Sequence, residues 1–352
     1  MSVYDTTVSR TILVVPDLDP ARLSEEARAG LPRLPALEQW LARGDVQAVA
    51  GGWRQWVQRT FAGRTLAGLP PASIAGAAVA GVPADRPVWL ATPVHFVPGL
   101  DTVRVHPAGL LPLAAAEQQA LQRDFARDFA GAGWSLHATG RRELLLVRGS
   151  GEERGEVRSD DPATWLGADP REGLPRGPGA GPLRRLGAEL EMWLHQHSIN
   201  DTRAARGQLG VNALWLWGGG AAVARPEDAA PGAESGPRGA VWADELFVDG
   251  LARCTRWPLL PLPAAWPSQA RASQAPEVRL VVAALGTPRD GHPLEAIDRD
   301  WIAPALAEWP RGTHELTLLT ARSAVTLRGR MLRRAWRALR RSRPWWQGLA
   351  AC

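Results

Sequence analysis

A chain of 352 residues with 45% hydrophobic content can bury a large core, which indicates a globular α/β protein of one large domain or two closely packed ones. Its two cysteines, Cys254 and Cys352, lie far apart without a CxxC motif, which excludes a disulfide framework and a cysteine zinc site. The net charge of +5 arises at the end of the chain, because nine arginines and no acidic residue follow Glu315. Residues 1–315 carry 32 basic and 36 acidic residues, so the body is slightly acidic.

The sequence also predicts the cellular compartment of the protein. The opening residues, MSVYDTTVSR, contain no apolar signal core, and no uninterrupted apolar run reaches the about 20 residues that span a bilayer. We therefore expect a cytoplasmic protein.

In chain order, residues 11–15 (TILVV) predict a first strand, closed by Pro16 and followed by Asp17. On spacing alone, Asp17 is a turn or helix-capping residue. Residues 31–46 carry apolar side chains at helical spacing, which predicts a helix that ends at Gly44.

Residues 66–82 are small and glycine-rich, and Ser73 within them is expected to be a loop or cap hydroxyl. Residues 86–105 predict a buried strand and then an alternating one. His95 lies between them, and a histidine beside apolar neighbours is typically structural. An amphipathic helix is predicted at 117–129, and two paired strands within 134–147.

The most specific stretch is residues 189–220, ELEMWLHQHSINDTRAARGQLGVNALWLWGGG. It begins as a helix that residues 198–200 stop. Residues 211–217 are apolar on both faces apart from Asn212, which is typical of a central strand covered by helices on each side.

Gly218, Gly219 and Gly220 follow this strand at once. A buried strand that leads into bare backbone indicates the ligand-binding edge of an open α/β sheet, so Asn212 and the three glycines are candidate ligand-binding residues. The spacing lacks both the GxGxxG fingerprint and a P-loop Lys-Ser/Thr, so neither a dinucleotide site nor a P-loop is indicated.

Four polar residues in this stretch are further candidates for binding an anion. His195 and His197 point about 200° apart on a continuous helix. They share one metal ion only if the helix has already ended; otherwise one packs under the 211–217 strand and the other caps the helix. Arg203 and Arg206 match phosphate or carboxylate, and solvated or ion-paired arginines are the equal alternative.

Three loop excursions rich in Gly and Pro are expected at 149–182, 221–239 and 258–277. After the second of these, residues 241–252 predict a helix. A buried strand is predicted at 278–285 and the last strand at 315–320.

The run LHQHSIND, then Arg203, Arg206 and Gly207, then VNALWLWGGG, resembles a bacterial family labelled regulatory protein of RpfE type. It is also similar to a segment of the archaeal-type cofactor-independent phosphoglycerate mutases, metal enzymes of the alkaline phosphatase superfamily. The resemblance implies a single alkaline-phosphatase-like α/β domain over residues 1–327, with a mostly parallel central sheet flanked by helices.

The same resemblance implies a metal site with Asp17 after the first strand, Asp290 and His292 after a later strand, and Ser73 as the phosphoryl acceptor. Another aspartate–histidine pair is expected after the strand at 315–320, where the sequence has Ala321, Arg322 and Ser323 instead. Arginine is always protonated and donates only, so it cannot hold a cation. We therefore expect a degenerate metal site, no cofactor, and a regulatory or binding role towards a small phosphorylated ligand or a protein partner.

The alternative is an active phosphoglycerate mutase or phosphohydrolase, which uses Mn²⁺ or Mg²⁺. A further alternative concerns residues 328–352, a basic amphipathic tail. Its arginines, among them Arg328 and Arg343, can contact an anionic membrane surface or nucleic acid, with Trp345 and Trp346 at the interface. A terminal helix docked on the body is the structural reading of the same segment.

Overall fold

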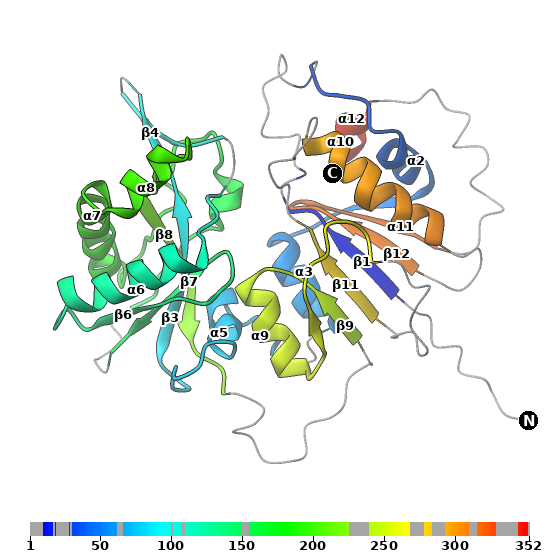
Figure 1. The fold of residues 1–352 in the computed structure, drawn as a ribbon. Helices are drawn as coiled ribbons and strands as arrows, with labels where there is room; N and C mark the ends of the chain where they lie inside the picture. The colour runs from blue at the N-terminus through cyan, green and yellow to red at the C-terminus, as the bar shows by residue number, and fades with distance from the viewer. Residues whose placement is uncertain are drawn as a thin grey trace, which may run out of the picture. The chain divides into compact units, whose positions relative to one another are not determined.

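The computed structural model describes residues 10–16, 18, 28, 30–61, 66–99, 101–107, 110–149, 155–224, 239–267, 278–283, 293–309, 315–328 and 344–350. Contacts group the chain into two compact units, each drawn with its helices and strands in Figure 1. Unit 1 comprises Met1–Ala67, Glu234–Ala243 and Trp257–Cys352; unit 2 comprises Gly68–Ala233 and Asp244–Arg256. The domain boundary predicted after residue 327 stays a prediction.

Unit 1 is built on a large sheet with helices. Its strands are β1 (Arg10–Val14), β2 (Asp45–Ala48), β9 (Gly239–Trp242), β10 (Leu259–Leu260), β11 (Val278–Val282), β12 (Glu315–Leu319) and β13 (Ser323–Leu327). Its helices are α2 (Pro35–Arg43), α3 (Gly52–Phe61), α10 (Pro293–Ile297), the π-helical segment η3 (Asp298–Ile302), α11 (Ala303–Glu308) and α12 (Trp345–Ala350).

Among the described residues, these strands form a seven-stranded sheet in the order β10-β9-β11-β1-β12-β13-β2. The first five run parallel, whereas β13 is antiparallel to β12, and β2 is antiparallel to β13. The mostly parallel sheet predicted from the sequence is therefore present in unit 1. The strand predicted at 315–320 is confirmed as β12, but the expectation that it is the last strand is wrong, because a tight turn returns the chain as β13.

Helix α2 shows how one face of this sheet is covered. Leu37 and Trp40 are fully buried, and Trp40 Nε1 donates to the Val325 carbonyl at 3.0 Å. The first backbone N–H groups of the helix have no capping side chain of their own. Instead the buried Asp298 carboxylate accepts from Ala36 N at 3.1 Å and Leu37 N at 2.8 Å. These two hydrogen bonds to a different helix satisfy the first N–H groups of α2 and hold η3 against it.

The described end of the chain packs on the same unit. In α12 the side chains of Trp345 and Leu349 are buried in the core that also contains Leu34 and Leu37. Trp345 is 2% exposed and its Nε1 donates to the Pro32 carbonyl at 3.0 Å, so this indole is not presented to an external surface. Residues 329–343, which contain most of the arginines of the basic tail, lie outside the described residues. None of the helices in the described part of the chain is long and apolar enough to cross a membrane.

Unit 2 is built on a second sheet. Its strands are β3 (Pro87–Val94), β4 (Phe96–Pro98), β5 (Val103–Val105), β6 (Trp134–His137), β7 (Leu144–Arg148) and β8 (Ala213–Ala221). Its helices are α5 (Pro71–Gly76), α6 (Ala115–Asp128), the 3₁₀ turn η2 (Pro162–Thr164), α7 (Gly181–His195), α8 (Ile199–Ala205) and α9 (Leu246–Thr255). Figure 1 shows α6, α7 and α8 together in this unit.

The sheet of unit 2 is antiparallel, in the order β6-β7-β3-β8, so the interpretation of residues 211–217 as a central strand of a parallel sheet is wrong. Among the described strands, β8 is an edge strand. Its apolar pattern still has the predicted cause, because both faces are covered: Leu214 and Leu216 join the core with α6 and α7, whereas Trp215 and Trp217 join the core with α5.

The glycines lie within β8 and not beyond it. The pairing of β3 with β8 shifts between Val88 and Leu90, and Gly218 there has φ +65°, a left-handed conformation that favours glycine. A Cβ on Gly219 would lie 2.0 Å from Trp89 Nε1, and one on Gly220 would lie 2.5 Å from Ser73 Oγ. The glycines therefore let an indole pack on one face of the strand and α5 on the other.

Two further expectations need correction or detail. The helix predicted at 241–252 is confirmed from Leu246 onward as α9, but it begins later than predicted, because residues 241 and 242 end the strand β9. In the excursion at 149–182, Arg158 and Arg176 exchange two backbone hydrogen bonds, and the Trp215 side chain donates from Nε1 to the Asp160 carbonyl at 2.9 Å.

The glycine packing gives a test of the fold. We expect Gly219→Ala to lower the free energy of unfolding by about 1–3 kcal/mol, because the new methyl overlaps the Trp89 indole. The matched control is Gly187→Ala in α7, where nothing lies within 4 Å of the added Cβ. This control should raise stability by about 0.5–1 kcal/mol. Urea denaturation measures both, and equal stability of Gly219→Ala and wild type would contradict the packing argument.

Candidate functional site

The candidate residues at 195–212 lie where α7 ends, α8 follows and β8 begins. One face of α7 is buried through Leu183, Leu186, Leu190 and Leu194, and the helix ends at His195 with Gln196 as its C-cap. Because the chain leaves the helix before His197, the two side chains differ in burial: His195 is exposed, whereas His197 is only 8% exposed. The two histidines thus face different environments.

Two asparagines join these elements. Asn200 Nδ2 donates to the carbonyls of Leu194 at 2.8 Å and Val211 at 2.9 Å, and its Oδ1 accepts from Val211 N at 2.7 Å. Asn212 makes the same kind of pair with Phe96, whose N donates to Oδ1 at 2.7 Å and whose carbonyl accepts from Nδ2 at 2.8 Å. Each amide acts as a strand partner for backbone that lacks one. Asn212, a candidate ligand-binding residue, therefore has a structural partner for both ends of its amide.

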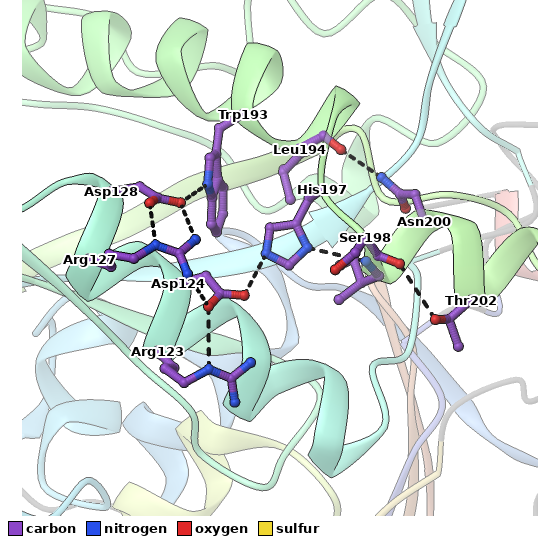
Figure 2. A network of polar contacts seen from close by, with 11 residues as sticks. Arg123, Asp124, Arg127, Asp128, Trp193, Leu194, His197, Ser198, Asn200 and Thr202 are labelled. Atoms are coloured by element: carbon purple, nitrogen blue, oxygen red, sulfur yellow. Dashed lines mark hydrogen bonds and ion pairs between the residues drawn. The ribbon is translucent and has the colours of Figure 1, made fainter.

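Figure 2 shows the network around His197. His197 Nε2 lies 3.3 Å from Asp124 Oδ2, and Nδ1 accepts from Ile199 N at 3.2 Å, which fixes the proton on Nε2. The ring packs edge-on against Trp193 with centroids 4.7 Å apart. Because both ring nitrogens are used within the chain, the ring has neither nitrogen left for a substrate in this conformation.

The electrostatics of this network follow from burial and from the arginines of α6. Burial lowers the pKa of His197, and the nearby Asp124 carboxylate opposes part of that effect. On the exposed side, Arg127 and then the Trp193 N–H lower the pKa of Asp128 to about 2. The network is therefore arranged around a neutral His197 imidazole and an ionised Asp128 carboxylate.

Arg203 is an ion-paired, buried residue. It is 3% exposed; its Nε donates to the Leu209 carbonyl at 2.7 Å, and Nη1 donates to the Pro112 carbonyl and to the buried Glu117 carboxylate, both at 3.1 Å. Of the two alternatives for this arginine, the described contacts favour the ion-paired one. Arg206 is exposed as the C-cap of α8 and remains a candidate anion ligand.

Ser73 lies in α5 and is 1% exposed. Its Oγ faces the backbone of β8 at Gly220, and its carbonyl accepts from Val223 N at 3.0 Å. A phosphoryl acceptor has to reach its substrate, so this position favours a packing role.

The residues implied as metal ligands, Asp17, Asp290 and His292, lie outside the described residues. The strands that precede them are adjacent: Val14 of β1 is the register partner of Val282 of β11 and of Leu319 of β12. Three strand ends therefore share one edge of the unit 1 sheet. Within the described part of the chain, no group of three or more His, Cys, Asp or Glu side chains is placed to hold a metal ion.

The sequence analysis missed the partners that α6 supplies. It predicted the apolar face of this helix, but not that Glu117 and Asp124 receive Arg203 and His197. It also did not single out His106, which lies beside His95 with ring centroids 5.9 Å apart. The sequence did carry a signal for these contacts. Glu117 and Asp124 lie on the helix with the apolar stripe, at three or four residues from one of its apolar side chains, so they neighbour its buried face.

No model of a protein family matches this chain, and no curated protein matches it. Among solved structures, it is similar to the cofactor-independent phosphoglycerate mutase from Thermoplasma acidophilum DSM 1728, with 16% identity, 91% of this chain and 89% of that chain covered, and a TM-score of 0.35. It is also similar to the PH0037 protein from Pyrococcus horikoshii, with 11% identity, 92% and 87% covered, and a TM-score of 0.46. At these identities and scores, neither similarity assigns an activity.

The burial of His197 predicts a pH-dependent stability. Because its pKa is lower in the folded state, the unfolded state takes up the proton first, and stability is lost as pH falls from about 6.5 towards the folded value. We expect wild type to lose more stability than His197→Gln between pH 7 and pH 5, as measured by urea midpoints. Exposed His195→Gln is the control that should follow wild type. Parallel curves for wild type and His197→Gln would contradict the prediction.

The buried ion pair predicts a large cost for removing one partner. Arg203→Met leaves the Glu117 carboxylate buried without its cation, so we expect a loss of about 3–5 kcal/mol in the free energy of unfolding. Arg171→Met, which removes the exposed pair with Asp169, should cost far less, because solvent screens exposed ion pairs. If the two variants were equally stable in denaturant titrations, Arg203 would not be a structural ion pair.

Proposed function

We propose that this chain is a cytoplasmic, non-catalytic relative of the phosphoglycerate mutases, with a degenerate metal site and a regulatory or binding role of the RpfE type. The observation that carries the proposal is the turn between β12 and β13. Thr320 N donates to the Ser323 carbonyl at 2.8 Å, and Ser323 N donates to Thr320 Oγ1 at 3.0 Å. Only Ala321 and Arg322 lie between them.

This turn stands where the mutase resemblance requires an aspartate–histidine pair. β1 lies between β11 and β12 in the sheet, so a two-metal site at this edge would need ligands from all three strand ends. Ala321 has no donor atom, and Arg322 cannot ligate a cation. The remaining candidates are two carboxylates, Asp17 and Asp290, and one imidazole, His292. That set does not fit two hard cations, each of which takes about six ligands.

The buried Ser73 supports the same proposal. A phosphoryl acceptor needs an exposed hydroxyl, whereas Ser73 is 1% exposed and its Oγ faces β8. The ligand is then bound without turnover, as a small phosphorylated molecule or a protein partner, and Arg206 is the exposed arginine proposed to contact it.

The test is metal content together with turnover. Untagged full-length protein, equilibrated with Mn²⁺ and then analysed by mass spectrometry, should retain fewer than two equivalents of metal. It should not interconvert 3- and 2-phosphoglycerate above the protein-free rate, because the charge clamp on the reacting oxygens is incomplete. Asp17→Ala should change neither result, and Asp19→Ala is the matched control. Two bound Mn²⁺ with turnover that Asp17→Ala alone abolishes would overturn the proposal.

A further inference from the structure

Strands β4 and β5 form a short antiparallel ribbon whose base carries two histidines. The pairs Phe96–Val105, Val97–Arg104 and Pro98–Val103 fix its register. One step further along the same register, His95 stands opposite His106, and His106 N donates to the His95 carbonyl at 2.8 Å. Residues directly opposite in an antiparallel pair have Cβ atoms about 4.5–5.5 Å apart on the same face. The topology thus brings together two imidazoles that are eleven residues apart.

The rings are already close. Their centroids lie 5.9 Å apart with an interplanar angle of 82°. Two imidazoles that each coordinate one metal ion at about 2.0–2.1 Å have centroids about 5–6 Å apart. The observed separation lies within this range.

The chain also orients one of the rings. His95 Nδ1 lies 2.7 Å from the Gly210 carbonyl, which can only accept, so Nδ1 carries the proton and Nε2 keeps its lone pair. A ring N–H donated to a backbone carbonyl is the usual second interaction of a metal-binding histidine.

The ribbon base is held in place around the pair. Val105, beside His106, is fully buried, and its N and carbonyl bond to Ala168 O at 3.0 Å and Gly167 N at 2.9 Å. Phe96, beside His95, is bonded on both sides by the Asn212 amide. Both histidines are half-buried, so part of each residue is accessible to solvent.

We propose that His95 and His106 bind one divalent transition metal ion of the Cu²⁺, Ni²⁺ and Zn²⁺ class. Imidazole nitrogen suits these ions, whereas oxygen ligands suit Mg²⁺ better. In the described part of the chain, no third His, Cys, Asp or Glu completes the cluster. The remaining coordination positions are therefore filled by water or by donor atoms of a bound ligand. This site lies in unit 2 and does not depend on the proposed loss of the metal site in unit 1.

The test is titration of the untagged full-length protein with Cu²⁺, followed by calorimetry against a competing chelator and by electron paramagnetic resonance. We expect one tight equivalent with nitrogen hyperfine structure. His95→Gln and His106→Gln should each weaken it about tenfold or more, because either change removes the chelate. Thermal melts of both variants confirm that they are folded.

The controls are His195→Gln, which changes an exposed histidine outside the pair, and His292→Gln, which changes the histidine implied for unit 1. Both should bind Cu²⁺ as wild type does. Unchanged binding in folded His95→Gln and His106→Gln would overturn the proposal, as would a loss confined to His292→Gln. Mn²⁺ retention, which tests the proposed function, is measured separately, so that the failure of one proposal is distinguishable from failure of the other.

Discussion

The constraint on which unit 2 depends is the close approach of backbone to backbone around α5. This helix has six residues, too few to be stable alone, so packing has to hold it in place. On one side, Gly220 of β8 leaves room for Ser73. On the other, a Cβ at Gly250 of α9 would lie 2.0 Å from the Ile74 carbonyl. Larger residues at either glycine would separate the helix from its neighbours and open the core that contains Trp215 and Trp217.

The polar groups of residues 194–220 that are buried or half-buried find their partners within unit 2. Asn200 and Asn212 supply strand partners, His197 uses both ring nitrogens, and Arg203 neutralises Glu117 while it bonds two carbonyls. Buried polar groups are costly unless each finds its partner, and a change at any one of them leaves another unpaired. The distinctive run of residues at 194–220 is thus accounted for, at these positions, by the architecture of the α7–α8–β8 corner.

The sequence predicted the helices and strands better than it predicted their positions in the sheets or the partners of their polar side chains. The spacing of apolar residues was sufficient to predict β1, α2, α6 and β11, because that spacing depends on whether one face or both faces of the element are buried. It could not distinguish a strand covered on both faces in a parallel sheet from one covered on both faces at an antiparallel edge, since the burial of β8 is the same in each. The polar partners were missed for a related reason. Asp124 and His106 matter through contacts set by helix packing and hairpin register, which local spacing does not specify.

The turn after β12 is also bonded to the rest of unit 1. Ser323, which closes the turn, donates its hydroxyl to the Leu349 carbonyl of α12 at 3.2 Å. Two residues on, the Val325 carbonyl accepts the Trp40 indole of α2, and β13 carries β2 along its other side. The residues that follow β12 therefore contribute to the core of unit 1, in which Val325 and Leu327 are buried beside residues of both helices.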